Sequence, residues 1–182
     1  MLARPILKMG NPILREIAAP IEDPTTPEIR ELVDVMKASM KEAGGVGLAA
    51  PQIGIPKRLV IFEVPGERIQ AEDGDEDSKG IDQTILINPE IIPMGDETSL
   101  GWEGCLSVPG LRGLVPRYHR IIYKGYDLAG DFAEVEASGF HARVVQHECD
   151  HLDGILYPER MTDMRELVYE SEMQAFMESY SR

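Results

Sequence analysis

The sequence predicts an α+β fold, because helix-like segments flank a series of strand-like runs. Apolar residues recur at helical spacing near both ends of the chain, and runs rich in isoleucine, valine and tyrosine lie between them. The chain has 182 residues, of which 43% are hydrophobic. This length suffices for one well-formed core and is short for two. We therefore expect a single domain over residues 1–182, without internal repeats.

The first predicted helix has signals at both ends. Thr26 is a candidate N-cap, Pro27 follows at the first helical position, and Gly44 and Gly45 mark the stop. Between these signals, the residues that recur on one helical face are Ile29, Leu32, Val33, Met36 and Met40.

Strand-like runs follow at residues 58–63, 84–92, 120–127 and 132–137. An acidic run at 72–77, between the first two, is expected to be a solvated loop. A last helix is predicted over residues 162–180. Its apolar stripe, which we expect to pack on the core, consists of Tyr169, Met173, Phe176, Met177 and Tyr180.

Two of the four histidines lie in the stretch "QHECDHLDG" at residues 146–154. On a helix, His147 and His151 would share one face, one turn apart, and two neutral imidazoles at that spacing can bind one divalent metal. Glu148 is then placed to act on a water molecule at the metal. A surface helix that happens to carry histidines is the alternative. The apolar residues on both sides of the motif argue against that alternative.

Catalytic metal sites usually have three protein ligands, so a third is expected. One known motif adds a histidine three residues after Gly154, but Tyr157 stands there. Cys105, in "GWEGCLSVPG", offers a thiolate on an exposed strand or turn, and spacing favours it modestly. Cys149 would point to the opposite side of the helix and is expected to be a small core residue. The other candidates are downstream glutamates: Glu166, Glu170 and Glu172.

The glycine-rich stretch "GGVGLAAPQIG" matches a relaxed dinucleotide-binding motif through Gly45, Gly47 and Ala50. That motif needs a strand before it and a helix after it, whereas here a helix precedes and Pro51 follows. These glycines are better explained by close approach of the backbone to a ligand, with Gln52 presenting its amide to the same ligand.

Bulk properties exclude several functions. A net charge of −14 argues against a protein whose main task is to grip nucleic acid, because phosphate binding needs basic surface. Pro5 and Pro12 interrupt the N-terminal region where an export signal needs an unbroken apolar stretch, and no apolar run is long enough to span a bilayer. The two cysteines are therefore expected to be reduced, buried or metal-bound.

The stretches "GVGLAAPQIG", "EGCLS" and "QHECDH", in that order, resemble the three motifs of the peptide deformylase family, whose members remove the N-formyl group from nascent chains. The resemblance extends from "ILKMGNPILR" through "INPEI" and "LRGLVPR" to the histidine helix. It implies mixed or antiparallel sheets packed around a central helix bearing H-E-x-x-H, with further helices near both termini. Residue patterns alone indicate only a mononuclear metal hydrolase; the formyl substrate follows from the resemblance.

The resemblance also implies roles for individual residues. Cys105, His147 and His151 would be the metal ligands, and Glu148 the general base and then acid. Gln52 and the backbone N–H of Leu106 would stabilise the oxyanion.

Further positions would contact the substrate or support the site. The backbone from Gly45 to Gly47 would pair with the substrate peptide as an added strand. Glu103 and Arg117 would form a structural ion pair behind the cysteine strand. The remaining expected substrate contacts are Val46, Gly104, Leu106, Arg112, Tyr118 and Val144.

The resemblance implies one divalent metal per chain, typically Fe(II), with zinc, nickel or cobalt also accepted. The implied substrates are N-formylmethionyl nascent peptides, met near the ribosome in the bacterial cytoplasm, although an organellar enzyme would share the fold. Residues 163–182 carry five acids and two bases, so we expect no strong nucleic-acid contact through this segment. The competing hypothesis is a zinc peptidase that uses both histidines and a downstream glutamate.

Overall fold

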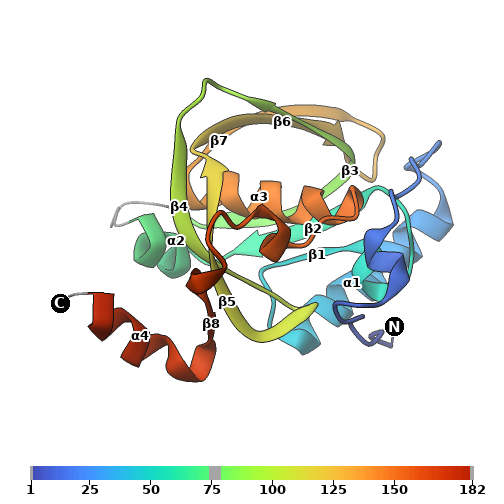
Figure 1. The fold of residues 1–182 in the computed structure, drawn as a ribbon. Coiled ribbons are helices and arrows are strands. Elements are labelled where there is room, and N and C mark those ends of the chain that lie inside the picture. The colour runs from blue at the N-terminus through green and yellow to red at the C-terminus, as the bar shows by residue number, and fades with distance from the viewer. Residues whose placement is uncertain (1, 74–78, 181–182) are drawn as a thin grey trace.

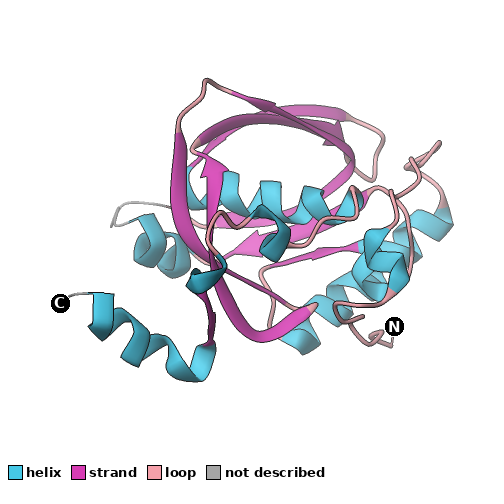
Figure 2. Ribbon diagram, viewed as in Figure 1, coloured by secondary structure: helices cyan, strands magenta, loops and turns pink. Residues whose placement is uncertain are grey.

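The computed structural model describes residues 2–73 and 79–180, and it confirms the predicted α+β class (Figure 1). Two antiparallel sheets form most of the molecule, as the magenta arrows in Figure 2 show. The five-stranded sheet has the order β1 (Gly47–Ala49), β2 (Leu59–Val64), β3 (Ile81–Pro93), β6 (Arg120–Tyr126) and β7 (Phe132–Ser138). The three-stranded sheet has the order β4 (Thr98–Cys105), β5 (Val108–Tyr118) and β8 (Leu167–Tyr169).

The α-helices of the described residues are α1 (Pro27–Ala43), α2 (Gly66–Asp73), α3 (Gly139–Leu152) and α4 (Met173–Tyr180). Short 3-10 helices join the elements: η1 (Pro12–Arg15), η2 (Ala50–Ile53), η3 (Tyr157–Arg160), η4 (Met164–Glu166) and η5 (Glu170–Glu172). The predicted ends of α1 are confirmed. The Thr26 side chain accepts a hydrogen bond from the N–H of Ile29, and Gly44 ends the helix with a φ of 68°. No helix in the described ranges is long and apolar enough to cross a membrane.

Alternation along β2 explains why helices cover both faces of the larger sheet. Val60 and Phe62 belong to the core cluster that includes α3, whereas Leu59 and Ile61 belong to the cluster that includes α1. Figure 1 shows α3 in the middle of the molecule, enclosed by strands of both sheets. The histidine motif is thereby held on a nearly fully buried element.

Two parts of the predicted secondary structure are wrong. Part of the region expected to be loop forms α2, and the acidic run begins inside this helix; residues 74–77 of the run lie outside the described residues. The predicted helix over 162–180 is interrupted by β8, because residues 167–169 pair with β5. Its apolar stripe is divided accordingly: Tyr169 and Met177 are exposed, whereas Met173 and Phe176 are half-buried. The Tyr180 side chain lies outside the described set.

Candidate metal centre and cleft

Three side chains from two elements converge at one end of β4. Cys105 is the last residue of that strand, and His147 and His151 lie on α3. One ligand atom of each residue lies within 4.8 Å of those of the other two, and Cys105 Sγ is 3.4 Å from His151 Nε2. In the part of the chain that the structure describes, these residues form the group able to hold a metal ion. Glu166, Glu170 and Glu172 are not part of it.

Local structure explains why these side chains meet. His147 and His151 are one turn apart on α3, and their ring centroids are 5.0 Å apart. Cys105 follows a register shift in the pairing of β4 with β5, which lies between Glu103 and Cys105. Such a bulge redirects the side chain that follows it. Tyr157, at the position where another motif has its third histidine, stacks on His147 with centroids 6.3 Å apart.

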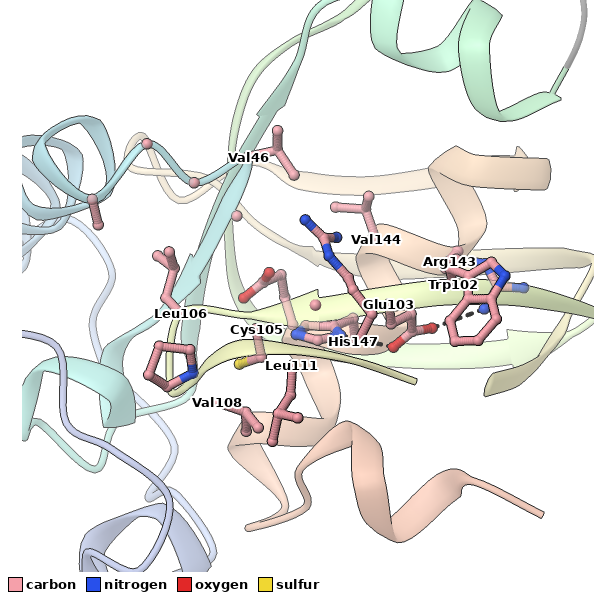
Figure 3. A pocket seen from close by; sticks show the side chains of 18 of the residues that line it. Val46, Trp102, Glu103, Cys105, Leu106, Val108, Leu111, Arg143, Val144 and His147 are labelled. Atoms are coloured by element: carbon pink, nitrogen blue, oxygen red, sulfur yellow. Dashed lines mark hydrogen bonds and ion pairs between the residues drawn. The ribbon is translucent and has the colours of Figure 1, made fainter. Parts of the chain in front are cut away.

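The chemistry of this donor set fits one divalent transition metal. Burial alone would raise the pKa of the Cys105 thiol, but His151 and His147 hold that pKa well below its usual value, which favours the thiolate. His147 Nδ1 lies 2.8 Å from Glu103 Oε2, so Nε2 is the ring nitrogen available to a metal. Thiolate and imidazole together suit iron or zinc better than magnesium or calcium. Figure 3 shows Glu103, His147 and Cys105 beside one another at the cleft.

A buried network of charges supports the ligands from behind. Arg117 donates to Glu103 Oε1 at 2.9 Å and to Asp150 Oδ2 at 2.5 Å, which confirms the expected Glu103–Arg117 pair. Arg143 also donates to Glu103, at 2.9 Å. Burial would raise the pKa of Glu103, but His147 and Arg117 hold it far below its usual value. This carboxylate therefore stays ionised and orients the His147 ring.

Glu148 is buried beside the cluster. Burial raises its pKa to about 7, against an ordinary value of 4.5. Its Oε2 is fully buried and has no hydrogen-bond partner in the structure. A Cβ atom added at Gly47 would overlap the Glu148 carboxylate, so this position has no room for a side chain. The glycine at this position therefore allows close approach of the backbone to Glu148, whereas its predicted approach to a ligand stays a prediction.

Gln52 is fixed by contacts with both of its amide atoms. Its Oε1 accepts a hydrogen bond from the N–H of Ala49 at 2.8 Å, and its Nε2 donates to Ser107 Oγ at 3.2 Å. The same Nε2 lies 3.5 Å from Cys105 Sγ. The amide N–H groups are therefore directed towards Ser107 and Cys105.

The N-terminal segment joins η2, which carries Gln52, to the turn that carries Leu106. The N–H of Leu7 donates to the Gln52 carbonyl at 2.8 Å, and the N–H of Met9 donates to the Ser107 carbonyl at 2.8 Å. Between them, Lys8 Nζ donates to the Leu106 carbonyl at 2.8 Å. Three consecutive residues thus tie η2 to the turn between β4 and β5.

A cleft of about 360 Å³ opens over these groups. It brings together nearly all of the predicted site residues. Those that line it are Gly45, Val46, Gly47, Gln52, Gly104, Cys105, Leu106, Arg112, Val144, His147 and Glu148. His151 lies below the surface of the cleft at 2% exposure. Tyr118 does not line it; its backbone N–H instead contacts the Gln146 side chain.

Sequence reasoning missed Trp102, Arg68 and Phe140 of the cleft wall, and it considered Glu170 only as a candidate metal ligand. Trp102 and Glu170 come from β4 and η5, and Arg68 and Phe140 come from α2 and α3. Pairing of β8 with β5 carries Glu170 to the cleft, and no local pattern predicts a pairing between residues so far apart in sequence. Cys149, by contrast, is a buried core residue as predicted.

Comparisons with known proteins agree on one family. The family model of polypeptide deformylases matches residues 3–166. Peptide deformylase 1 of Bordetella pertussis is 57% identical over 164 residues, which cover 90% of each chain. Peptide deformylase 2 of Ralstonia nicotianae is 52% identical over 162 residues, 89% of each chain. A Met-Ala-Ser-bound crystal structure of the class I type b peptide deformylase from Acinetobacter baumannii has a TM-score of 0.78 and 41% identity, covering 88% of this chain and 99% of that chain.

Proposed function

The chain belongs to the peptide deformylase family, and from this premise we propose that it removes the N-formyl group from the N-terminal formylmethionine of newly synthesised polypeptides, releasing formate. The observation that supports this proposal most strongly is that three separate parts of the sequence meet at one cleft. Gln52, Cys105 and Glu148 come from three separate sequence motifs and line one cleft.

The family is metal-dependent, and we assign Cys105, His147 and His151 as the ligands of one divalent metal. The soft thiolate and the two imidazoles suit iron or zinc. The resemblance to the family implies Fe(II) in the cell, with zinc, nickel or cobalt able to replace it. A divalent metal supplies Lewis acidity at this point, which polarises a carbonyl group and makes water more acidic. Three protein ligands leave room for water or substrate.

Glu148 performs the proton transfers in the proposed reaction. Ionised, it takes a proton from the attacking water at Oε2, the atom that has no partner in the structure. It then gives the proton to the methionine nitrogen as the bond between that nitrogen and the formyl carbon breaks. Burial raises the pKa of Glu148 above its ordinary value, which favours uptake of the proton that the leaving nitrogen then receives.

Gln52 and Leu106 stabilise the oxyanion of the tetrahedral intermediate. Gln52 Nε2 and the backbone N–H of Leu106 donate hydrogen bonds to it, each worth about 3 kcal/mol in comparable enzymes. The fixed Oε1 of Gln52 keeps the amide from turning over. The substrate backbone pairs with Gly45–Gly47, and Val46, Leu106 and Val144 surround the methionine side chain.

Residues 1–182 form one domain that acts in the bacterial cytoplasm on chains leaving the ribosome. With five acids and two bases, residues 163–182 are not a nucleic-acid-binding segment. Contact with the ribosome is therefore transient.

The direct test measures formate released from formyl-Met-Ala-Ser by the metal-loaded protein. The acetylated peptide Ac-Met-Ala-Ser is the matched control, since it differs only by a methyl group on the acyl carbon. We expect formate from the first and no acetate from the second. Cleavage of internal bonds in unformylated peptides, without formate release, would instead favour a zinc peptidase.

A further inference from the structure

The C-terminal segment 167–180 lies beyond the residues 3–166 that the family model matches, yet it forms part of the cleft. Strand β8 pairs with β5, with Tyr169 opposite Leu111. Helix α4 is anchored by Phe176, whose ring meets Trp102 edge-on with centroids 5.7 Å apart. Figure 1 shows β8 beside β5 and α4 extending from it on the same side of the molecule as α2.

Glu170 follows β8 directly. Its carboxylate contacts Arg112, a residue that the sequence predicts to contact the substrate. Arg112 Nε donates to Glu170 Oε1 at 2.7 Å. Both residues line the cleft, and their side chains are 32% and 49% exposed. A Cβ atom at Gly104 would lie 2.8 Å from Arg112 Nη1 and 3.0 Å from Nε. The guanidinium thus lies against the backbone of Gly104, one residue from Cys105.

A second recess continues the cleft outward, between α2 and the C-terminal segment. It is lined by Arg68, Ala71, Trp102, Arg112, Glu170 and Met173. Arg68, Trp102, Arg112 and Glu170 line both spaces, so a peptide entering the cleft can extend between α2 and the C-terminal segment. The residues that follow methionine in a substrate present peptide carbonyls, which accept hydrogen bonds from a guanidinium.

We propose that Glu170 is a positioning residue that holds the Arg112 guanidinium for binding the peptide backbone beyond the methionine. The ion pair engages Nε, and the two terminal nitrogens carry the other four N–H donors of the group. Fixing a long, flexible side chain before the substrate arrives reduces the entropy lost on binding. This inference rests on the proposed function, and it places part of the peptide specificity in a segment that the family model does not match.

The test compares Glu170→Gln with the parent on two substrates. For formyl-Met-Ala-Ser we expect KM to rise about two- to fivefold, the range for a partly exposed ion pair, with kcat unchanged. For formyl-methioninamide, which has no residue after methionine, we expect no change in either constant. Glu172→Gln is the matched control, because Glu172 lies on the same turn and does not line the cleft.

Three further variants separate positioning from folding. Arg112→Ala should raise the tripeptide KM more than Glu170→Gln does, and the double variant should equal Arg112→Ala alone, because Glu170 acts through Arg112. Arg112→Lys retains a charge for Glu170 but lacks the forked donors, so it should behave like Arg112→Ala.

Trp102, the single tryptophan of the chain, provides a readout that does not depend on turnover. Titration of the metal-loaded protein with Met-Ala-Ser, followed by Trp102 fluorescence, should show the same loss of affinity in Glu170→Gln. Parental KM and parental affinity in that variant would overturn the inference, as would a lower kcat on both substrates. A parent that releases no formate would overturn the proposed function instead.

Discussion

Strand β5 carries two arginines, Arg112 and Arg117, that pair with carboxylates in opposite surroundings. Arg117 is 5% exposed and bridges Glu103 and Asp150 inside the protein. Arg112 lies at the rim of the cleft and pairs with Glu170. Breaking a buried pair leaves an unpaired charge in a medium of low polarity, whereas water solvates both partners of an exposed pair.

The two pairs therefore have different consequences for function. The inner pair determines the position of Glu103, which in turn orients His147, so its loss should affect both folding and metal binding. The outer pair lies away from Glu103, so under the proposal above its loss should change substrate binding and leave metal binding intact. The same ionic chemistry thus occurs in a buried network behind the cleft and in an exposed pair at its rim.

The largest effect on stability should come from Arg117→Ala. Arg143 still pairs with Glu103 and Arg160 with Asp150, but the substitution removes the buried cation that both carboxylates share. We expect a loss of about 2–3 kcal/mol in the free energy of unfolding. Denaturant unfolding of the metal-loaded protein measures it. Arg120→Ala is the control, because Arg120 pairs with Glu136 at the surface and its loss should cost less than about 1 kcal/mol. Equal losses in the two variants would contradict the distinction between buried and exposed pairs.

Glu103→Gln should act on metal binding. Glutamine preserves the shape but removes the charge that fixes the His147 ring, and substitutions of this kind typically weaken metal affinity about 10–100-fold. Competition with a chelator of known affinity gives the value. Glu134→Gln, which alters the exposed pair with Lys124, should retain parental affinity. If Glu103→Gln also retains parental metal affinity, the Glu103 carboxylate has no part in orienting His147.

A smaller effect is expected at His141, where burial lowers the pKa of the ring. His141 packs against Phe62, and its Nε2 lies 3.3 Å from Tyr123 Oη. As pH falls through 6.5, the ordinary histidine value, the unfolded chain gains a proton more readily than the folded one, so stability decreases. The contribution is at most about 1.4 kcal/mol per pH unit.

The measurement is the free energy of unfolding at pH 7.5 and 5.5 for the parent and His141→Gln. The parent should lose more stability than the variant over this range. Carboxylates that titrate in this range change the free energy of unfolding of both proteins. The difference between parent and variant in the slope of this free energy against pH therefore isolates the contribution of His141. Identical slopes would mean that the folded protein protonates this ring as readily as the unfolded chain does.

Much of the site could be predicted from local sequence. Helical spacing placed His147 and His151 on one face, and capping signals gave the ends of α1. Spacing alone, however, left Cys105 only modestly ahead of the downstream glutamates, because a ligand from a different element depends on a β-bulge and on tertiary pairing. The resemblance to a family supplied that assignment.

The C-terminal region could not be predicted for a related reason. Its apolar spacing suits a helix, but pairing with β5 gives residues 167–169 a strand conformation, and tertiary pairing outweighs local propensity. Arg143 shows the same limit of prediction from local sequence. Nothing near it in sequence indicates that its guanidinium reaches Glu103, 40 residues away along the chain.

The central claim is that the three ligands hold the metal while Glu148 moves the proton. Glu148→Gln tests it most directly, because glutamine keeps the shape of the side chain but cannot take up a proton. Metal content by mass spectrometry and formate release should be measured on the same sample, together with binding of Met-Ala-Ser. We expect one metal per chain, parental affinity for the peptide and a loss in kcat of roughly 10³-fold or more. Loss of the metal would make Glu148 a ligand or a structural support, and near-parental turnover with the metal retained would remove it from the mechanism.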